Sequence, residues 1–425
     1  MSEYQNALNY LYEKLPVFQR IGAVAYKKDL TNTLALCEAL GNPQHKFKSL
    51  HVTGTNGKGS SSHMLAAILQ AAGYKTGLYT SPHLKEFTER IRINGIEVSK
   101  DFVVDFVNRI KPEIERIQPS FFEVTVAMAF DFFARQHVDI AVIEVGLGGR
   151  LDSTNVITPV ISLITNISYD HQDILGDTLP EIAFEKAGII KSNVPVVVSE
   201  RQKEVEHVFI NKAKETNSKL TFASDLLKVS MLREGEFFVQ HGDTASTFKL
   251  ALKGYYQQKN LAGVLAVTRI LQSKGYTISE NDIKTALEQT TQLTGLKGRW
   301  QKLNDHPLMI CDTGHNEAGI TEVLHQIGEQ QFNKLHLVIG FVRDKDIGKV
   351  LSLLPHNALY YFCQAKIPRA MPAAELKERA EQEGLTGVAI ADVNEAIEAA
   401  RMNCQEDDMI FIGGSTFVVA EIENL

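Results

Sequence analysis

The sequence predicts an α/β protein with a large N-terminal domain, built on a mostly parallel sheet flanked by helices, and a smaller C-terminal α/β domain. Three observations lead to this prediction. The chain has 425 residues, more than a single hydrophobic core usually serves. Helical patterns alternate with short apolar runs along most of the chain, as they do where helices cover both faces of a parallel sheet. These runs consist largely of Val and Ile, which suits strands buried on both faces.

The first domain is predicted to span residues 1–296. Its first 46 residues are mostly helical in pattern, and a helix over 60–72 is predicted to end at Gly73. Residues 219–252 alternate between apolar and polar, which predicts a small antiparallel excursion, and two helices follow at about 257–275 and 279–292. The predicted strands are residues 47–53, 76–80, 140–145, 160–165 and 194–199.

The second domain is predicted to span residues 297–425. It follows the stretch TGLKGRW, residues 294–300, whose two glycines predict a hinge. A second alternating series of strands and helices then begins, as expected for a smaller α/β domain. Its predicted strands lie near residues 308–312, 335–339, 359–363 and 409–412.

The composition argues against several classes of function. The formal net charge is −7 at pH 7 and both signs are interspersed, so the chain offers no positive stripe for nucleic acid or anionic lipid. No apolar run approaches the ~20 residues that span a bilayer, and the N-terminus does not resemble a secretion signal. We therefore expect a cytoplasmic protein with small-molecule partners. The widely spaced cysteines argue against a disulfide framework or a metal knuckle: Cys37, Cys311, Cys363 and Cys404.

Residues 51–62, HVTGTNGKGSSS, form a glycine-rich stretch between a predicted strand and a predicted helix. Backbone amides at a helix N-terminus, together with the charge of Lys58, suit the binding of phosphate. The common phosphate loop has four residues between its first glycine and Gly-Lys-Ser/Thr. Here Gly54 lies only three residues before Gly57, and Gly59 stands where a magnesium-binding hydroxyl is expected. A tight connection that binds nothing is the alternative.

Polar residues at the ends of two other predicted strands are candidates for the missing metal ligand. Ser81 precedes Pro82, which holds it extended, so that its hydroxyl can project from the strand end. Glu144 ends an apolar strand, where a carboxylate is costly unless it is paired or bound to a cation such as Mg²⁺. The alternatives are an ordinary turn at Ser81 and a structural salt bridge from Glu144 to Arg150.

Two further candidates follow the fourth predicted strand, in NISYDHQDILG and FEKAGII. His171 is a candidate metal ligand, although a lone histidine is more often only hydrogen-bonded. Lys186 stands amid apolar residues, including Phe184, and a buried cationic lysine needs a partner or a changed charge. The alternative for Lys186 is a partly exposed side chain whose ammonium group reaches water.

These strings carry a resemblance to a known family. GTNGKGS, TSPHLKEFTERIRING, EVGLGGRLDSTN and DHQDILGDTLPEIAFEKAGIIK resemble the folylpolyglutamate synthase and dihydrofolate synthase family, the folate branch of the Mur-type ATP-dependent amide ligases. The resemblance continues through LKGRW, DTGHN and GFVRDKD, so it covers essentially the whole chain. Two stretches depart from it. DTGHNE stands at 312–317 where the family commonly has Asp-Gly-Ala-His-Asn-Pro, and RIGAVAYKKDL, at 20–30, differs in a segment that borders the pterin pocket.

The resemblance implies a P-loop-type N-terminal domain, a Rossmann-like C-terminal domain and a set of site residues. It implies that Lys58, His171 and Lys186 are catalytic, and that two Mg²⁺ ions are held by Ser81, Glu144, His171 and a Lys186 carbamylated by carbon dioxide. It places Phe122 and Asp152 near the pterin or its benzoate. The implied ATP-binding residues are Gly54, Thr55, Asn56, Gly57, Lys58, Gly59, Ser60, Asn260, Arg299, Asp312 and His315.

The implied reaction joins L-glutamate to dihydropteroate or to the γ-carboxyl of a reduced folate. ATP phosphorylates the acceptor carboxylate, and the glutamate amine then displaces phosphate from the acyl phosphate, which leaves ADP and phosphate. We expect both reactions in one monomeric enzyme, with the two domains closing over the nucleotide. The alternatives are a Mur-type ligase acting on another acid and a catalytically silent ATP-binding relative.

Overall fold

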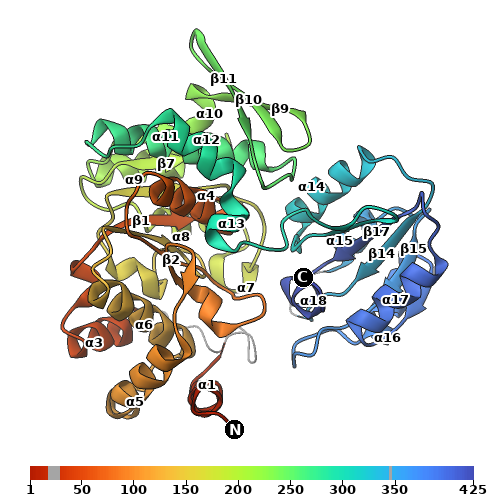
Figure 1. The fold of residues 1–425 in the computed structure, drawn as a ribbon, viewed down its shortest axis with the longest axis horizontal. Helices are drawn as coiled ribbons and strands as arrows, with labels where there is room; N and C mark the ends of the chain where they lie inside the picture. The colour runs from red at the N-terminus through yellow and green to blue at the C-terminus, as the bar shows by residue number, and fades with distance from the viewer. Residues whose placement is uncertain (18–28, 344–346) are drawn as a thin grey trace. The chain divides into compact units, whose positions relative to one another are not determined.

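The computed structural model describes residues 1–17, 29–343 and 347–425, which form two compact units (Figure 1). The first unit comprises Met1–Ala251 and Gln257–Leu296, and the second comprises Leu252–Tyr256 and Lys297–Leu425. Most of RIGAVAYKKDL and the last three residues of GFVRDKD lie outside the described residues. Each unit has its own sheet and its own hydrophobic core.

The first unit is built on an eight-stranded sheet in the order β4-β3-β2-β5-β1-β6-β7-β8. The six strands from β2 to β8 in this order are parallel, whereas β3 and β4 form an antiparallel edge. Every residue of β2, β5, β6 and β7 is buried, as the Val/Ile-rich runs predict. The strands are β1 (Lys48–Thr53), β2 (Thr76–Tyr79), β3 (Ile91–Ile93), β4 (Ile96–Glu97), β5 (Ile140–Glu144), β6 (Ile161–Ile164), β7 (Val196–Val198) and β8 (Leu220–Phe222).

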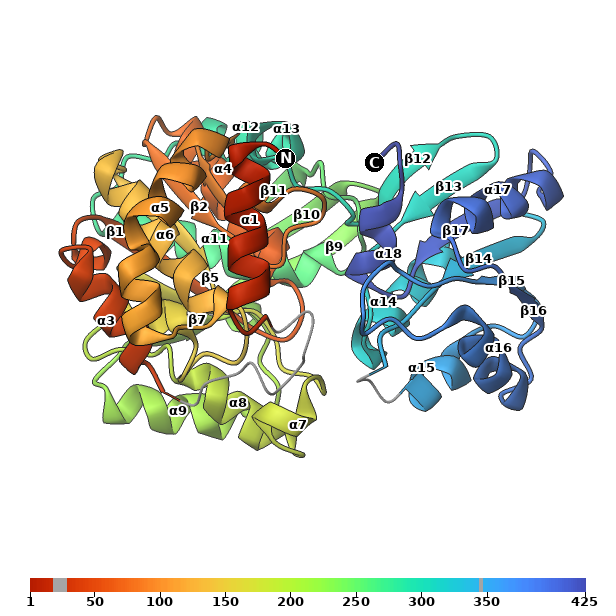
Figure 2. The ribbon, with the colours of Figure 1, turned by 90° about the horizontal axis from the view of Figure 1, so that it is seen from below.

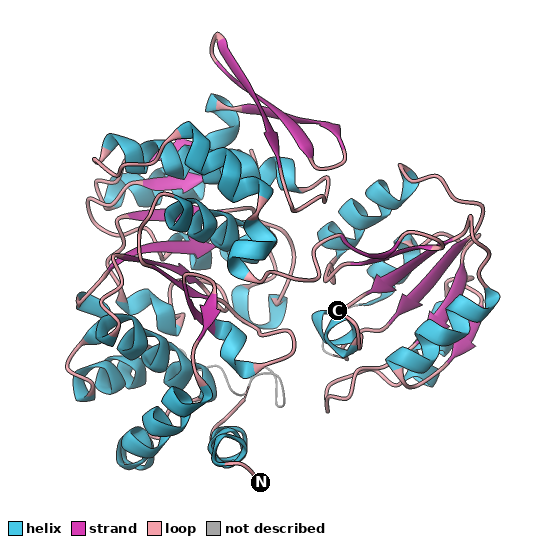
Figure 3. Ribbon diagram, in the orientation of Figure 1, coloured by secondary structure: helices cyan, strands magenta, loops and turns pink. Residues whose placement is uncertain are grey.

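Helices cover both faces of this sheet (Figures 2 and 3). On one face, α5 and α6 pack on Tyr79, Ala141 and Ile143, and α8 and α9 pack on the strands beyond. On the other face lie α4 and α11. The helices are α1 (Glu3–Lys14), α3 (Thr31–Ala39), η2 (Pro43–His45), α4 (Lys58–Ala71), η3 (Phe87–Arg90), α5 (Lys100–Ile117), α6 (Phe121–Arg135), η4 (Ser153–Val156), α7 (Gln172–Leu175), α8 (Leu179–Ala187), α9 (Glu206–Glu215), α10 (Ala223–Leu226), α11 (Gln257–Ser273), α12 (Glu280–Glu288) and α13 (Thr290–Thr294).

Local sequence explains where several of these helices begin and end. At the start of α6, the Glu123 amide donates to the Ser120 hydroxyl, and the Ser120 amide donates to the Glu123 carboxylate. Two backbone N–H groups that the helix itself cannot pair are thus hydrogen-bonded. Gly73 follows α4 with φ +86°, a conformation that glycine adopts without steric cost. The helix predicted at 279–292 is two helices, because the chain leaves helical geometry at Gln289.

The small antiparallel sheet predicted within 219–252 is present, but it begins later. It consists of β9 (Lys228–Arg233), β10 (Glu236–His241) and β11 (Thr244–Lys249), in the order β11-β10-β9. Residues 220–222, which the prediction included in it, instead form β8 and pair in parallel with β7 of the main sheet. Three residues are too few for a periodic pattern to reveal which sheet they join.

The second unit is a six-stranded sheet in the order β12-β13-β17-β14-β15-β16, with only β12 antiparallel. The edge strands β12 and β16 were not predicted, since half-exposed strands carry no continuous apolar run. Among the described residues, no helix combines the length and the apolar character needed to cross a membrane. The elements are β12 (Gln301–Asn304), β13 (Leu308–Cys311), α14 (Glu317–Gly328), β14 (Leu335–Ile339), α15 (Ile347–Leu353), β15 (Leu359–Phe362), α16 (Ala373–Gln382), β16 (Gly387–Ala389), α17 (Val393–Asn403), β17 (Met409–Gly413) and α18 (Thr416–Glu421).

Candidate active site

The carboxyl ends of four neighbouring parallel strands bring the predicted polar segments to one edge of the first sheet. The glycine-rich loop follows β1, Ser81 follows β2, Glu144 ends β5, and the segment leading to His171 follows β6. In the pairing register, Val52 of β1 lies opposite Glu144, and Thr53 lies opposite Ile164 of β6. Ligands of parallel α/β sheets gather at such an edge.

Two glycines of the loop are required by close approaches. Gly54 has φ +150°, and a Cβ atom there would lie 1.8 Å from the Thr165 hydroxyl oxygen. Gly57 has φ +85°, and a Cβ atom there would lie 2.1 Å from Oδ1 of Asn260. The loop is therefore packed between the segment after β6 and the first turns of α11, and the structure places Asn260 against it.

Hydrogen bonds fasten the loop to the segment after β6. The Asn56 amide donates to Oδ1 of Asn166 at 2.8 Å, and the Thr165 hydroxyl donates to the Asn56 carbonyl at 2.5 Å. The Thr55 amide donates to the Asn166 carbonyl, and the Ser168 amide donates to the Thr55 hydroxyl at 3.0 Å. These bonds fix the backbone just before α4, whose N-terminus begins at Lys58.

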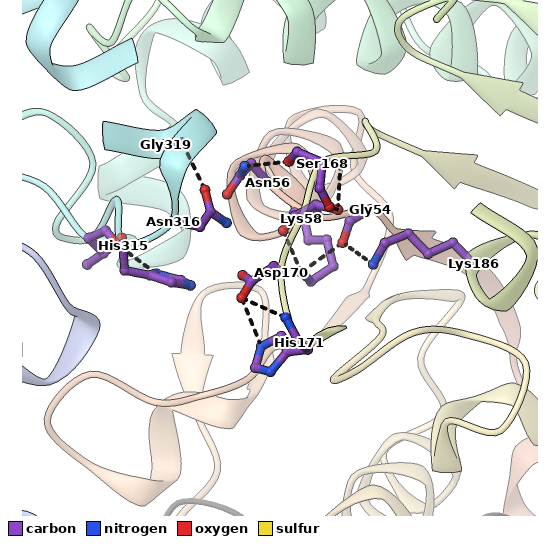
Figure 4. Close-up of polar contacts among 12 residues, drawn as sticks. Gly54, Asn56, Lys58, Ser168, Asp170, His171, Lys186, His315, Asn316 and Gly319 are labelled. Atoms are coloured by element: carbon purple, nitrogen blue, oxygen red, sulfur yellow. Dashed lines mark hydrogen bonds and ion pairs between the residues drawn. The ribbon is translucent and has the colours of Figure 1, made fainter. Parts of the chain in front are cut away.

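Two lysine ammonium groups meet at one carbonyl of the loop (Figure 4). Nζ of Lys58 donates to the Gly54 carbonyl at 3.0 Å and to the Thr55 carbonyl at 3.1 Å. Nζ of Lys186 donates to the same Gly54 carbonyl at 3.0 Å. Burial, followed by the Lys58 charge, lowers the pKa of Lys186 to about 7. Lys186 is 3% exposed, so the snorkelling alternative is wrong; Phe184, expected beside it, is 54% exposed.

Ser81, which follows β2, lies beside Glu144, the last residue of β5. The Ser81 amide donates to Oε2 of Glu144 at 3.1 Å, and Glu144 is 4% exposed. Arg150, considered as a salt-bridge partner of Glu144, binds Oε1 of Glu185 on α8 at 2.8 Å. A hydroxyl and a carboxylate, both hard oxygen donors, are thus held together at the same sheet edge as the loop.

His171 lies beyond β6 as the N-cap residue of α7. Its amide donates to Oδ1 of Asp170 at 3.0 Å, and its Nε2 lies 3.8 Å from the same oxygen (Figure 4). Asp170 also raises the pKa of Lys186, against the effect of burial, which places a negative charge near that ammonium group. Sequence reasoning missed Asp170, although it directly precedes His171 in the quoted motif.

Gln257 is a second residue that sequence reasoning missed. It is fully buried at the start of α11, where its Nε2 donates to the Ser60 hydroxyl of α4 at 3.2 Å. Asn260, one turn later, donates to Oε1 of Gln257 at 2.8 Å. No local pattern marks Gln257, because only the packing of α11 on α4 brings it to the loop.

The two residues predicted to lie near the pterin or its benzoate, Phe122 and Asp152, contact the loop between β5 and η4, residues 145–152. The ring of Phe122 packs against Gly146, where a Cβ atom would lie 2.4 Å from Cζ, and its centroid is 6.3 Å from that of Tyr79. Asp152 is buried and accepts from the Leu147 amide at 2.8 Å and from the Thr154 hydroxyl at 2.5 Å. Burial raises the pKa of Asp152. Its carboxylate therefore holds the loop between β5 and η4.

The other predicted nucleotide contacts belong to the second unit, where they lie close together. Asp312, at the carboxyl end of β13, accepts from the Tyr256 hydroxyl and the Trp300 amide, both at 2.6 Å. Arg299 donates to the Thr313 hydroxyl. Nδ1 of His315 lies 2.9 Å from the Thr313 carbonyl oxygen. The sequence did not predict that Tyr256 contacts Asp312. Burial, together with Asp312, raises the pKa of Tyr256 well above its ordinary value.

Comparisons with known proteins agree with this architecture. Residues 52–268 match the family model described as Mur ligase middle domain, and residues 298–416 match Mur ligase, glutamate ligase domain. The dihydrofolate synthase/folylpolyglutamate synthase of Bacillus subtilis is 32% identical over 99% of this chain and 98% of the relative.

Solved structures are similar over nearly the full length. E. coli FolC in complex with DHPP and ADP is 28% identical with a TM-score of 0.86, covering 99% of this chain and 97% of that one. The bifunctional folylpolyglutamate synthase/dihydrofolate synthase of Yersinia pestis, complexed with AMPPNP and Mn ion, is 29% identical with a TM-score of 0.84, at 99% and 97% coverage.

Proposed function

Because the chain belongs to the folylpolyglutamate synthase and dihydrofolate synthase family, whose members carry Mur ligase domains, we propose that it is an ATP-dependent ligase that joins L-glutamate to dihydropteroate and to reduced folates. The observation that carries the proposal is the convergence of four strand-end segments on one edge of the first sheet. This edge combines a helix N-terminus, two lysines and a pair of hard oxygen donors.

The glycine-rich loop and the start of α4 are assigned to the ATP phosphates. Amides at a helix N-terminus and the charge of Lys58 would stabilise the negative charge that spreads over the transferred phosphoryl group. Asn260 and Gln257 support the loop from α11. We assign this chemistry to residues 1–296, and further nucleotide contacts to Arg299, Asp312 and His315.

The donor set beside the loop fits Mg²⁺. Ser81 and Glu144 supply oxygen atoms, which Mg²⁺ prefers, and their number leaves positions for water and phosphate oxygens. The ion would neutralise phosphate charge there. We assign His171, with Asp170 beside it, to a second ion.

Lys186 is assigned as a carbamate. A primary amine adds to carbon dioxide only in its neutral form and releases one proton, and a pKa of about 7 leaves a large neutral fraction at neutral pH. The product is an anion with two oxygen donors, which suits its position beside the Lys58 ammonium group better than a second cation does. Burial disfavours the ammonium form and so supplies the neutral amine that this addition requires.

The reaction then has two steps. A carboxylate oxygen of the acceptor attacks the γ-phosphorus of ATP, the bond to ADP breaks, and an acyl phosphate forms. The amine of glutamate, having lost a proton, attacks the acyl carbon, and the carbon–oxygen bond to phosphate breaks. The protein aligns the carboxylate with the γ-phosphate through Lys58 and the loop. The carboxylate of Asp170, next to His171, is the proposed proton acceptor, and Phe122 and Asp152 are the proposed neighbours of the acceptor's ring.

The test is phosphate release in separate incubations with dihydropteroate and with tetrahydrofolate, each with L-glutamate and ATP, followed by mass analysis. We expect ADP, phosphate and a product heavier by one glutamyl residue in both incubations. Phosphate release with only one of the two acceptors would show that the protein catalyses a single reaction. Release with neither acceptor, by folded protein, would contradict the proposal and favour a ligase for another acid or a silent relative.

A further inference from the structure

A second group of metal-ligating side chains lies in the second unit, at the sheet edge opposite Asp312. His336 is the second residue of β14, and Asp408 immediately precedes β17, so both stand at the amino ends of neighbouring parallel strands. Cys404 ends α17, which packs on the same strands. The three residues come from separate elements that the fold brings to one place, and the proposed ligase chemistry uses none of them.

The ligand atoms of these residues converge. The candidate donor atoms of His336, Cys404 and Asp408 all lie within 4.8 Å of one another, and Nε2 of His336 is 3.4 Å from Oδ2 of Asp408. A tetrahedral ion with bonds of about 2.0–2.1 Å holds adjacent nitrogen and oxygen ligands about 3.4 Å apart. The distance between Nε2 of His336 and Oδ2 of Asp408 therefore fits two ligands of one ion as well as it fits a direct hydrogen bond.

Surrounding groups orient the ligands. Nδ1 of His336 lies 3.2 Å from the Tyr361 hydroxyl, which leaves Nε2 facing Asp408. Oδ1 of Asp408 accepts from the Lys334 amide at 3.0 Å. The Gln405 amide donates to Oδ2 of Asp408 at 2.8 Å, which closes the turn that carries Cys404 back toward the strand ends. Metal-binding histidines and carboxylates are commonly held by such outer partners.

We propose that His336, Cys404 and Asp408 bind a Zn²⁺ ion, with water as the fourth ligand. One imidazole, one thiolate and one carboxylate form a donor set that Zn²⁺ accepts and that Mg²⁺, which prefers oxygen alone, does not. His336 and Asp408 are buried, which favours an ion that neutralises the carboxylate, whereas Cys404 is partly exposed and gives the ion a route of entry. None of these three residues is among the Mg²⁺ ligands assigned above.

The test uses the full-length chain, reduced and stripped of metal with a chelator, and titrated with Co²⁺ and then with Zn²⁺. Apart from any Co²⁺ at the Mg²⁺ ligands assigned above, we expect one Co²⁺ per chain to give a sulfur-to-cobalt charge-transfer band, and that band should be lost when Zn²⁺ displaces Co²⁺. Cys404→Ser should lose the band and weaken Zn²⁺ binding by more than about tenfold. Tyr361→Phe should weaken it by roughly tenfold, because an outer partner of the histidine is removed.

A matched control is His356→Gln, which changes an exposed histidine of the same unit and should bind Co²⁺ as the parent does. Thermal unfolding without metal checks that Cys404→Ser remains folded. Absence of the charge-transfer band from the parent chain, or a band that persists in Cys404→Ser, overturns the proposal and leaves His336 and Asp408 as a structural hydrogen bond. Glutamate ligation in Mg²⁺ is measured in parallel and is expected to be unchanged in Cys404→Ser, so the two proposals fail separately.

Discussion

The ammonium groups of Lys58 and Lys186 both donate to the carbonyl oxygen of Gly54, at 3.0 Å each. Two cations on one acceptor are unfavourable unless an anion joins them or one of them loses its charge. Lys58 lies at the helix N-terminus, where a phosphate would meet it, whereas Lys186 is 3% exposed and has a pKa lowered to about 7. The two lysines are therefore expected to act differently.

Lys58→Ala is expected to reduce ligation with either acceptor by about 10² to 10³-fold, as the loss of one strong transition-state donor typically does. Its side chain is partly buried and donates two hydrogen bonds to the loop, so the variant should stay folded and lose about 1–3 kcal/mol of unfolding free energy. Steady-state phosphate release is the measurement, and Lys46→Ala, an exposed lysine elsewhere in the first unit, is the control. Turnover near the parent value would show that the loop lysine does not assist phosphoryl transfer.

Lys186 is expected to carry a carbamate. With ¹³C-labelled bicarbonate, the parent chain should give a carbamate resonance that Lys186→Met lacks. Lys186→Met should also lose ligase activity, while its stability should equal or exceed that of the parent, because a buried ionisable group is replaced by an apolar side chain of similar volume. A resonance of equal strength in the variant would assign the carbamate to another amine.

Glu144→Gln keeps the shape of the side chain and removes its charge. We expect the Mg²⁺ concentration for half-maximal activity to rise by more than about tenfold, because a carboxylate ligand is lost. The control is Glu215→Gln, whose side chain is 64% exposed on α9. An unchanged Mg²⁺ dependence in Glu144→Gln would remove this residue from the metal site.

Gly57→Ala tests the close approach of α11 to the loop. Gly57 and Gly275 have similar positive φ angles, +85° and +90°, but only at Gly57 would the new Cβ meet another group, at 2.1 Å from Asn260. Gly275→Ala should cost about 1 kcal/mol of stability and leave ATP binding intact. Gly57→Ala should also weaken ATP binding by at least about tenfold. Equal ATP affinity in the two variants would contradict the packing argument.

Acid is expected to destabilise the first unit through His51 and His83. Burial lowers the pKa of each to about 3, from an ordinary value of 6.5, and Arg90 contributes at His83. A depressed folded-state pKa favours folding above pH 6.5, and this contribution is lost as pH falls through 6.5 toward 3. Between pH 7.5 and 5.5 each histidine should lower the unfolding free energy by about 1.4 kcal/mol.

Urea unfolding at the two pH values measures this loss. His83→Gln should lose about half of the pH dependence that the two histidines produce, whereas His241→Gln, which changes an exposed histidine, should keep all of it. An identical pH dependence in the parent chain and in His83→Gln would show that His83 can be protonated in the folded state.

Much of the site could be predicted because its residues follow apolar runs. A run such as residues 140–144 predicts a buried strand by itself, and parallel strands bring their carboxyl ends to one edge whatever their order. Glu144 and Lys186 were marked by a further local signal, a charge among apolar neighbours. Gln257 carried no such signal, since its role depends on α11 packing against α4.

The sequence alone determined the α/β class, the strand-end positions of the polar motifs and the family, because periodicity, burial and motif spacing are properties of short stretches of chain. Only the tertiary structure decided that 220–222 joins the main sheet, that Lys58 and Lys186 share one acceptor, and that His336, Cys404 and Asp408 converge. Each of these three findings depends on strand register or on packing between segments far apart in the chain. The local spacing of residues encodes neither the register nor the packing.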